Sequence, residues 1–427
     1  MKARWLRRSL WLAGFACLWV NVCDDPPLAS GSYLVDVTQH SAILGLITAD
    51  PVVVTATVRN DKGQVVVRMV DERPRRRHHF AAAGLSPGSS FEYLLESEGC
   101  EPERGTIRTA PPGDRGHFKI AFLGDSGDQP WWVWLQRTPA LHLPAKWGWF
   151  ADSPTVSRIG SAVAEARPDF VLHLGDIVYP RGQHAHYRSG FFRPFAPVLR
   201  DSPVFAVLGN HDVMDSGGLQ AIANLRPPSA LDSRDRRNIS FAWGPVRIIG
   251  LDCNSDYSGE RYELGHPAQV FLSEQLAKCT EPWIVVASHF PMLSASRQGN
   301  RAELLKALRP ELQHFQVSLY LSGHDHCYQR FGKPPEGGPP LVVSGGGGKD
   351  LYEIRKDSHA AAHAAALVSA HHWCSAEVSG SSLTVRSHGL DGSLLDSFDL
   401  PLPTGEDLVR LRRDNPARAN RVAELQQ

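Results

Sequence analysis

The chain has 427 residues, of which 42% are hydrophobic, and its 45 lysine and arginine side chains balance 45 aspartates and glutamates. This length exceeds one ordinary hydrophobic core and predicts two domains, or one large domain with an appendage. The composition excludes a disordered chain. The balanced charge gives no indication of nucleic-acid recognition or of attraction to an anionic lipid surface.

Residues 1–30 have the pattern of an export signal or membrane anchor. The apolar run over 10–22 follows four basic side chains, those of Lys2, Arg4, Arg7 and Arg8. This run is shorter than the roughly 20 residues that span a bilayer, which favours an export signal. We therefore expect an exported protein that is periplasmic, extracellular or attached to a membrane through its N-terminus. Cleavage of the signal stays open.

Residues 31–112 are expected to form an all-β domain. Short β-branched runs such as "PVVVTATVRN" and "QVVVRMVD" are separated by turn residues such as "NDKG". Several strands at short intervals, without a helix between them, predict a small β-sandwich. The stretch resembles a fibronectin type III domain, and "LSPGSSFEY" is its most recognisable turn.

Residues 117–400 change to alternating strands and helices. "HFKIAFLGD" and "VLHLGD" are apolar strands that end in Gly-Asp, and the amphipathic stretch "TVSRIGSAVAEARPDF" leads into the second of them. Four more apolar strands follow, in "PVFAVLGNHD", "VRIIGLDCN", "PWIVVASHFP" and "VSLYLSGHDH". This alternation predicts an α/β core whose ligand site lies at the strand ends along one edge.

Potential metal ligands stand at five of these strand ends. One Gly-Asp turn or one histidine after a strand is usually structural, but five endings rich in oxygen and imidazole donors indicate a metal site. The donors are Asp125, Asp176, Tyr179, Asn210, His289, His324 and His326. Such a set suits Zn, Mn or Fe, and Asp176 could bridge two ions about 3.5–4 Å apart, as in two-metal hydrolytic sites.

The five blocks resemble those of the binuclear metallophosphoesterases, and within them the purple acid phosphatases. In chain order they read "DSG", "GDIVY", "GNHD", "VVASH" and "GHDH". Gly127 stands where the wider superfamily has a histidine, and Tyr179 supplies the tyrosine that is then expected. The resemblance covers about 117–400 and implies a four-layer αββα sandwich, preceded here by the fibronectin type III-like domain.

The resemblance also implies a role for each donor. Fe(III), coloured by charge transfer from a phenolate, would be bound by Asp125, Tyr179 and His326. A divalent ion (Zn, Mn or Fe) would be bound by Asn210, His289 and His324, with Asp176 bridging both ions. His211 would be the catalytic acid for the leaving group or a donor to the transition state, and the alternative is that it orients a ligand.

An exported, binuclear metal-dependent acid phosphatase follows from this resemblance, hydrolysing phosphomonoesters through a metal-bound hydroxide. An alternative on the same site is a phosphodiesterase, or a nucleotide or phospholipid hydrolase. An alternative of another class is a non-catalytic binding protein that works through the β-sandwich. The expected partner is a small phosphoester substrate, and the oligomeric state is not predicted.

One position departs from the resemblance. Gln298 occupies the place of a second substrate-facing histidine, beside Arg297. The expected replacement for that histidine in facing the substrate is Arg297, or else His184 or His186. The alternative for the two histidines is that they are solvated loop residues. His173 is expected to be structural, and Asp325 is expected to be a spacer between two ligands.

Three other features carry expectations of their own. An oxidising compartment would pair Cys253 with Cys279 and Cys327 with Cys374, and the alternative is buried free thiols. Five tryptophans within 131–149 could form a lid or aromatic platform, a membrane-facing patch, or a surface packed on the β-sandwich. The polar tail 403–427 is expected to be a helix or disordered.

Overall fold

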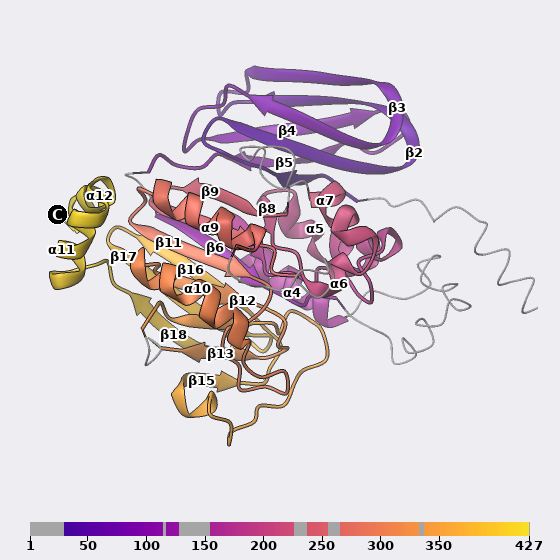
Figure 1. Cartoon of the computed structure of the whole chain (residues 1–427). Helices are drawn as coiled ribbons and strands as arrows, with labels where there is room; N and C mark the ends of the chain where they lie inside the picture. The colour runs from indigo at the N-terminus through magenta and orange to yellow at the C-terminus, as the bar shows by residue number, and fades with distance from the viewer. Residues whose placement is uncertain are drawn as a thin grey trace, which may run out of the picture.

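The computed structural model describes residues 30–113, 117–127, 154–225, 237–254, 265–332 and 337–426. The expected export signal and the tryptophan-rich segment 131–149 lie outside the described residues. Figure 1 shows a β-rich unit seated on a larger α/β unit, with the last two helices at one side. No helix within the described ranges is both long enough and apolar enough to cross a membrane.

The first unit is all-β, as the sequence predicts. Its strands are β1 (Tyr33–Val35), β2 (Ser41–Arg59), β3 (Val65–Ala83), β4 (Ser90–Ser97) and β5 (Glu103–Arg108). They form one hydrogen-bonded sheet in the order β1-β2-β4-β5, in which the long β2 also pairs with β3. Phe91, Tyr93 and Leu95 alternate along β4 and are buried, as the period of a strand requires. The likeness to a fibronectin type III domain stays a prediction.

The second unit contains two mixed sheets. The six-stranded sheet has the order β18-β17-β16-β6-β7-β8, and the seven-stranded sheet has the order β15-β13-β14-β12-β11-β10-β9. The strands of the first are β6 (His117–Leu123), β7 (Phe170–His173), β8 (Val204–Ala206), β16 (His372–Ser379), β17 (Ser382–Gly389) and β18 (Leu394–Leu400). Those of the second are β9 (Ile239–Trp243), β10 (Val246–Leu251), β11 (Trp283–Ser288), β12 (Leu319–Ser322), β13 (Tyr328–Phe331), β14 (Leu341–Ser344) and β15 (Ala364–Val368).

Helices cover the outer faces of both sheets (Figure 1). On the six-stranded side these are α4 (Pro154–Glu165), α5 (Arg193–Leu199) and α7 (Leu219–Leu225), and the short α6 (Asn210–Val213) follows β8 at the carboxyl edge of the sheet. On the seven-stranded side they are α9 (Pro267–Lys278) and α10 (Ala302–His314). The short turns are η2 (His184–His186), η3 (Arg188–Phe192), η4 (Ser216–Gly218) and η5 (Ala361–His363).

Alternating side chains build the two sheets into four layers. Phe118, Ile120 and Phe122 of β6 belong to the core between the sheets, whereas Ala121 and Leu123 face the helices. The strands of the other sheet divide in the same way, because successive side chains of a strand point to opposite faces. The result is the αββα sandwich implied by the resemblance.

The β-unit is fixed to the α/β unit by hydrogen bonds as well as by apolar contact. The Tyr93 hydroxyl donates to the carbonyl oxygen of Arg200 at 2.9 Å, and the Thr106 N–H donates to Asp201 Oδ1 at 2.8 Å. The Arg108 guanidinium donates to the carbonyl oxygen of Pro168 at 2.7 Å. Buried residues of both units form one continuous hydrophobic cluster. The two units are therefore expected to behave as one body.

The C-terminal tail forms two helices, α11 (Gly405–Asp414) and α12 (Pro416–Gln426). Arg418 of α12 is buried, and its guanidinium donates to four backbone carbonyl oxygens. These belong to Glu281, Pro282, Phe315 and Gln316. The helical alternative for the tail is therefore the one the structure has.

The cysteine pairs proposed from the sequence are absent, since none of the five described cysteines is part of a disulfide. Helix α9 runs back along β10, so Cys253 lies beyond the carboxyl end of the strand while Cys279 lies beyond the far end of the 12-residue helix. At 1.5 Å per residue this separation far exceeds disulfide reach. Cys327 and Cys374 instead contact Gln329 Nε2 and Ser344 Oγ. The alternative of buried thiols holds for these four.

Candidate metal centre

The seven predicted donors meet where the carboxyl ends of the two sheets come together. In one sheet β6, β7 and β8 are parallel neighbours, and Asp125, Asp176 and Asn210 follow them. In the other sheet β11 and β12 are parallel neighbours, and His289 and His324 follow them. Parallel strands end at the same edge, so the chain brings five loops to one place.

Three donors sit on strained backbone. Asp125, Asp176 and His324 have φ angles of 59°, 52° and 68°. Non-glycine residues adopt this left-handed conformation only where the surrounding structure enforces it, and such residues cluster at functional sites. At two of these positions the carboxylate reaches a neighbouring loop. Asp125 Oδ2 accepts from the His324 N–H and Asp176 Oδ1 accepts from the His211 N–H, both at 2.8 Å.

A first group of donors surrounds the Tyr179 hydroxyl. Its oxygen lies 3.0 Å from both Asp125 Oδ1 and Asp176 Oδ2, to one of which its single hydrogen is donated, and 3.4 Å from His326 Nε2. His326 Nε2 is also 3.4 Å from Asp125 Oδ1. Two carboxylates, one phenol and one imidazole thus converge on one point.

A second group of donors surrounds the other oxygen of the Asp176 carboxylate. Asp176 Oδ1 lies 3.4 Å from His289 Nε2. Asn210 Oδ1 lies 3.1 Å from His289 Nε2 and 3.1 Å from His324 Nδ1. The ligand atoms of Asp125, Asp176 and His289 all lie within 4.8 Å of one another. Asp176 therefore presents one oxygen to each group, as a residue that bridges two ions would.

Backbone carbonyls fix which imidazole nitrogens are available. His289 Nδ1 donates to the carbonyl oxygen of Leu174 at 2.9 Å, and His326 Nδ1 donates to that of Asp350 at 2.7 Å. A carbonyl only accepts, so each ring holds its hydrogen on Nδ1 and points Nε2 at the donor groups. Lone pairs converging in this way need a cation between them. The residues therefore fit a pair of metal ions.

The electrostatics of the bare cluster favour a cation as well. Burial, and then the charges of Asp125 and Asp176, raise the pKa of the Tyr179 hydroxyl well above its usual value. Burial lowers the pKa of His289, but the Asp176 charge outweighs it and the pKa rises to about 9. A metal ion that binds here would displace the protons of these two groups.

His211 lies beside this cluster without belonging to either group. Its Nδ1 donates to the carbonyl oxygen of Pro180 at 2.6 Å, and its Nε2 is 4.0 Å from Asp176 Oδ2. The side chain is 22% exposed, against 2% for Asp176. The ring also stands 4.4 Å from that of Tyr179. His211 can therefore present Nε2 to a molecule that enters from solvent.

Two acidic residues do more than the sequence indicated. The buried Asp212 accepts hydrogen bonds from the N–H groups of Asp176, Ile177 and Gly209, which ties the loop after β7 to the loop after β8. Asp325, expected to be a spacer, accepts a hydrogen bond from Ser294 Oγ. Asp212 stands in the quoted "GNHD" block, but only the fold reveals what its carboxylate binds.

The other residues that the sequence singled out lie in different environments. His173 is buried, its Nε2 lies 2.8 Å from Ser126 Oγ, and burial lowers its pKa to about 3. It has a structural environment, next to the loop that carries Asp125. His186 contacts Gln183 Oε1 within its own turn. Arg297 is exposed and lies over the ring of Tyr352.

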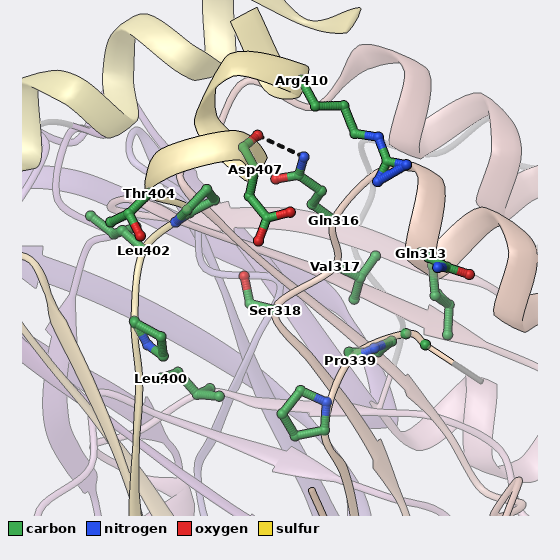
Figure 2. A pocket seen from close by; sticks show the side chains of 16 residues that line it. Gln313, Gln316, Val317, Ser318, Pro339, Leu400, Leu402, Thr404, Asp407 and Arg410 are labelled. Atoms are coloured by element: carbon green, nitrogen blue, oxygen red, sulfur yellow. Dashed lines mark hydrogen bonds between the residues drawn. The ribbon is translucent and has the colours of Figure 1, made fainter. Parts of the chain in front are cut away.

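A separate pocket of about 350 Å³ lies at the opposite edge of the sheets. Figure 2 shows it between the start of β12, the proline segments around Pro339 and Leu402, and helix α11. The Gln316 side-chain amide donates to the backbone carbonyl oxygen of Asp407 across it, at 2.9 Å. The described residues that line it include no imidazole or thiol, whereas the described metal-binding side chains gather at the strand ends.

Comparison with known proteins agrees with the fold and places the chain in a family. The family model described as calcineurin-like phosphoesterase matches residues 118–328. Tartrate-resistant acid phosphatase type 5 of Mus musculus is 30% identical over 241 residues, which cover 49% of this chain and 73% of that protein. The structure of a purple acid phosphatase from yellow lupin aligns with a TM-score of 0.70 at 16% identity, covering 88% of this chain and 75% of that one.

An uncharacterized protein of Mycobacterium tuberculosis is 28% identical over 300 residues. The match covers 65% of this chain and 53% of that protein, so the chain spans about half the length of that relative. Fold and donor set together define a metallophosphoesterase. The chain belongs to the calcineurin-like phosphoesterase family, among its purple acid phosphatase-like members.

Proposed function

We propose that the chain is an exported, binuclear metal-dependent acid phosphatase that hydrolyses phosphomonoesters. One observation carries the proposal: the Asp176 carboxylate directs one oxygen at each of two donor groups. Two ions held a few ångströms apart by a shared carboxylate form the arrangement that clamps a phosphoryl group during in-line displacement. The acid phosphatases among the relatives support the choice of reaction.

The two donor groups suit different ions. Asp125, Tyr179 and His326 include a hard phenolate and a hard carboxylate, which favour Fe(III). Asn210, His289 and His324 offer one amide oxygen and two imidazoles, which favour a divalent ion such as Zn, Mn or Fe. When bound, such a pair would polarise the phosphoryl oxygens. It would also lower the pKa of water near the ions, so that hydroxide is available as the nucleophile at lower pH.

The chain's own residues orient the site and move a proton. The contact of His211 Nδ1 with the carbonyl of Pro180 fixes the ring. In its protonated form His211 would give the Nε2 proton to the departing ester oxygen, which avoids the release of an alkoxide. Asp212 holds the loops that carry Asp176 and Asn210 at a constant separation.

Replacement of Asp176 tests the proposal. Asp176→Asn keeps the shape of the side chain but removes the charge that both ions share, so metal content and turnover of an aryl phosphate should fall together, the latter at least about 100-fold. Asp399→Asn, on the exposed side of β18, is the matched control. Wild-type turnover by Asp176→Asn, or turnover without bound metal, would refute the assignment.

The metal and substrate assignments have their own measurements. A visible absorption band that disappears in Tyr179→Phe would establish Fe(III) on the phenolate, whereas an active, colourless, iron-free protein would contradict it. Faster turnover of an aryl phosphate than of a bis-aryl diester is expected. The reverse preference would favour the phosphodiesterase.

Export is proposed from residues 1–30, whose basic and apolar runs have the signal pattern. Fractionation of cells that express the full chain should place it outside the cytoplasm, soluble or attached to a membrane. Deletion of residues 2–22 should leave it in the cytoplasm. An unchanged distribution after this deletion would contradict export through this segment.

A further inference from the structure

A glycine-rich segment closes one side of the metal centre. Residues 345–348 are four glycines, and they run against the loop that carries Asp125. A Cβ atom on Gly345 would lie 2.3 Å from the carbonyl oxygen of Asp325, and one on Gly347 would lie 2.4 Å from that of Gly124. Contacts this close exclude any side chain. The glycines therefore let the segment approach the donors and deliver the residues that follow.

Tyr352 is the aromatic residue that this segment delivers. Its ring stacks on that of His326, with the centroids 4.0 Å apart and the planes 29° apart, and its N–H donates to the carbonyl oxygen of His326 at 3.0 Å. The Arg297 guanidinium carbon lies 3.9 Å from the centroid of the same Tyr352 ring. Two planar groups this close to one centroid cannot share a face. Tyr352 is therefore sandwiched between His326 and Arg297.

The loop that carries Arg297 is held firmly. The N–H of Ala295 donates to Gln329 Oε1 at 2.7 Å, and the N–H of Arg355 donates to the carbonyl oxygen of Ala295 at 2.7 Å. Ser294 bonds to Asp325, the residue between the two histidines of the last block. Arg297 is therefore fixed relative to His326 from two directions, through Asp325 and through Tyr352.

The charge of Arg297 is not neutralised by a carboxylate within 4 Å among the described residues, in contrast to Lys349, whose ammonium pairs with Asp350 Oδ2 at 3.2 Å. Stacking occupies a face of the guanidinium and leaves N–H groups at its edge for a ligand. The side chain is exposed. An ordered, exposed guanidinium at the rim of a site is suited to bind a carboxylate or phosphate through two hydrogen bonds.

The Tyr352 ring stands between Arg297 and His326, so the guanidinium lies beyond the donor groups and not among them. Resting on the function proposed above, we propose that Arg297, supported by Tyr352, binds a second anionic group of the substrate. The site then selects phosphomonoesters that carry a further carboxylate or phosphate. The glycine run, Tyr352 and Arg297 together form this rim subsite.

A matched pair of substrates tests the subsite. Phenyl phosphate and 3-carboxyphenyl phosphate share an aryl leaving group and differ by one carboxylate. The metal-loaded full chain should have a kcat/KM about fivefold to tenfold higher for the carboxylated substrate, mainly through a lower KM, which is the size of one charge-assisted contact at a partly exposed site. The ratio of the kcat/KM values for the two substrates does not change when a variant loses activity equally toward both.

The variants separate the guanidinium from its support. In Arg297→Gln the ratio should fall to about one, since the charge is gone. In Tyr352→Leu the guanidinium loses its platform and the ratio should fall, whereas in Tyr352→Phe, which keeps the ring, most of it should persist. Lys356→Gln removes one positive charge from the exposed stretch beyond Tyr352 and should leave the ratio at the wild-type value.

Binding without turnover gives a second readout. Calorimetric titration with phenylphosphonate and 3-carboxyphenylphosphonate, which have no ester bond, should give the same order of affinities and the same loss of preference in Arg297→Gln. A wild-type ratio near one, or an unchanged ratio in Arg297→Gln, would overturn the rim subsite. Failure of the loaded wild-type chain to hydrolyse either ester would instead overturn the proposed function, whatever the phosphonates do.

Discussion

Gly127 leaves the space that the ring of Tyr179 fills. A Cβ atom at this position would lie 2.2 Å from Tyr179 Cδ2 and 2.9 Å from the Tyr179 backbone nitrogen. A histidine at position 127, as in the wider superfamily, therefore cannot coexist with this tyrosine. The sequence pairs a missing histidine with an added tyrosine, and the structure supplies the steric reason for the exchange.

Substitution of this glycine should disrupt the first donor group. In Gly127→Ala the new methyl group displaces the Tyr179 ring, so its hydroxyl leaves Asp125 and Asp176, and metal affinity should fall at least about tenfold. Metal content after gel filtration, together with the visible spectrum, measures the loss. Gly332→Ala is the control, since a Cβ there meets nothing within 4 Å. Wild-type metal content and spectrum in Gly127→Ala would contradict the steric argument.

At this scale the sequence predicted residue types better than their contacts. The seven donors converge, because each lies in a loop that follows an apolar strand, and strand ends can be read from local pattern. The contacts of Asp212 and Asp325 could not be read in this way. Each depends on a loop from another part of the chain, such as the one that holds Ser294.

The last helix is an element whose attachment rests on one buried cation. Arg418 of α12 donates to four carbonyl oxygens that precede β11 and β12, and burial lowers its pKa to about 10. Asn415 adds a hydrogen bond from Nδ2 to the carbonyl oxygen of Cys279 at 2.7 Å. The tail sequence predicted a helix as one alternative, but an arginine in a polar segment gives no sign of burial.

Removal of this cation should loosen the tail without affecting the chemistry. Arg418→Ala removes four hydrogen bonds to backbone carbonyl oxygens, each with a net worth of about 0.5–1.5 kcal/mol, so the free energy of unfolding should fall by about 2–6 kcal/mol. Urea unfolding measures this loss of free energy. Arg418→Lys is the comparison variant, because it keeps the positive charge but lacks the planar guanidinium with its several N–H donors. Turnover at 25 °C should persist because the metal centre lies at the opposite edge. Unchanged stability in Arg418→Ala would show that the helix docks by apolar contact alone.

For the whole molecule, the order of elements was predictable but the division into sheets was not. The alternation of strands and helices indicates parallel neighbours such as β6 and β7, which are close in sequence. The antiparallel pairing of β6 with β16 joins residues near 120 to residues near 376. Such long-range pairing leaves no local pattern, and here the αββα arrangement came from resemblance alone.

The stability of the whole molecule in acid depends in part on a buried histidine at the contact between the two sheets. His372 begins β16 of the six-stranded sheet, and its N–H donates to the carbonyl oxygen of Gly346, beyond β14 of the other sheet, at 3.0 Å. Its Nε2 lies 3.1 Å from Ser344 Oγ. Burial, opposed by a hydrogen bond to Ala370 and aided by His371, lowers the pKa of His372 to about 4.

A histidine whose pKa is lower in the folded state than in the unfolded chain stabilises the protein above the unfolded pKa of about 6.5 and loses that stability as the pH falls toward 4. When the pH falls from 7 to 5, the free energy of unfolding should therefore decrease by about 2 kcal/mol because of His372. The unfolded chain takes up a proton on this side chain in that range, whereas the folded protein does not. His372→Gln keeps an acceptor for the Ser344 hydroxyl, which donates to His372 Nε2, and should flatten this part of the pH dependence by that amount. Urea unfolding at the two pH values measures it, with the exposed His363→Gln as control. Equal slopes in wild type and His372→Gln would mean that other groups set the acid limit of the fold.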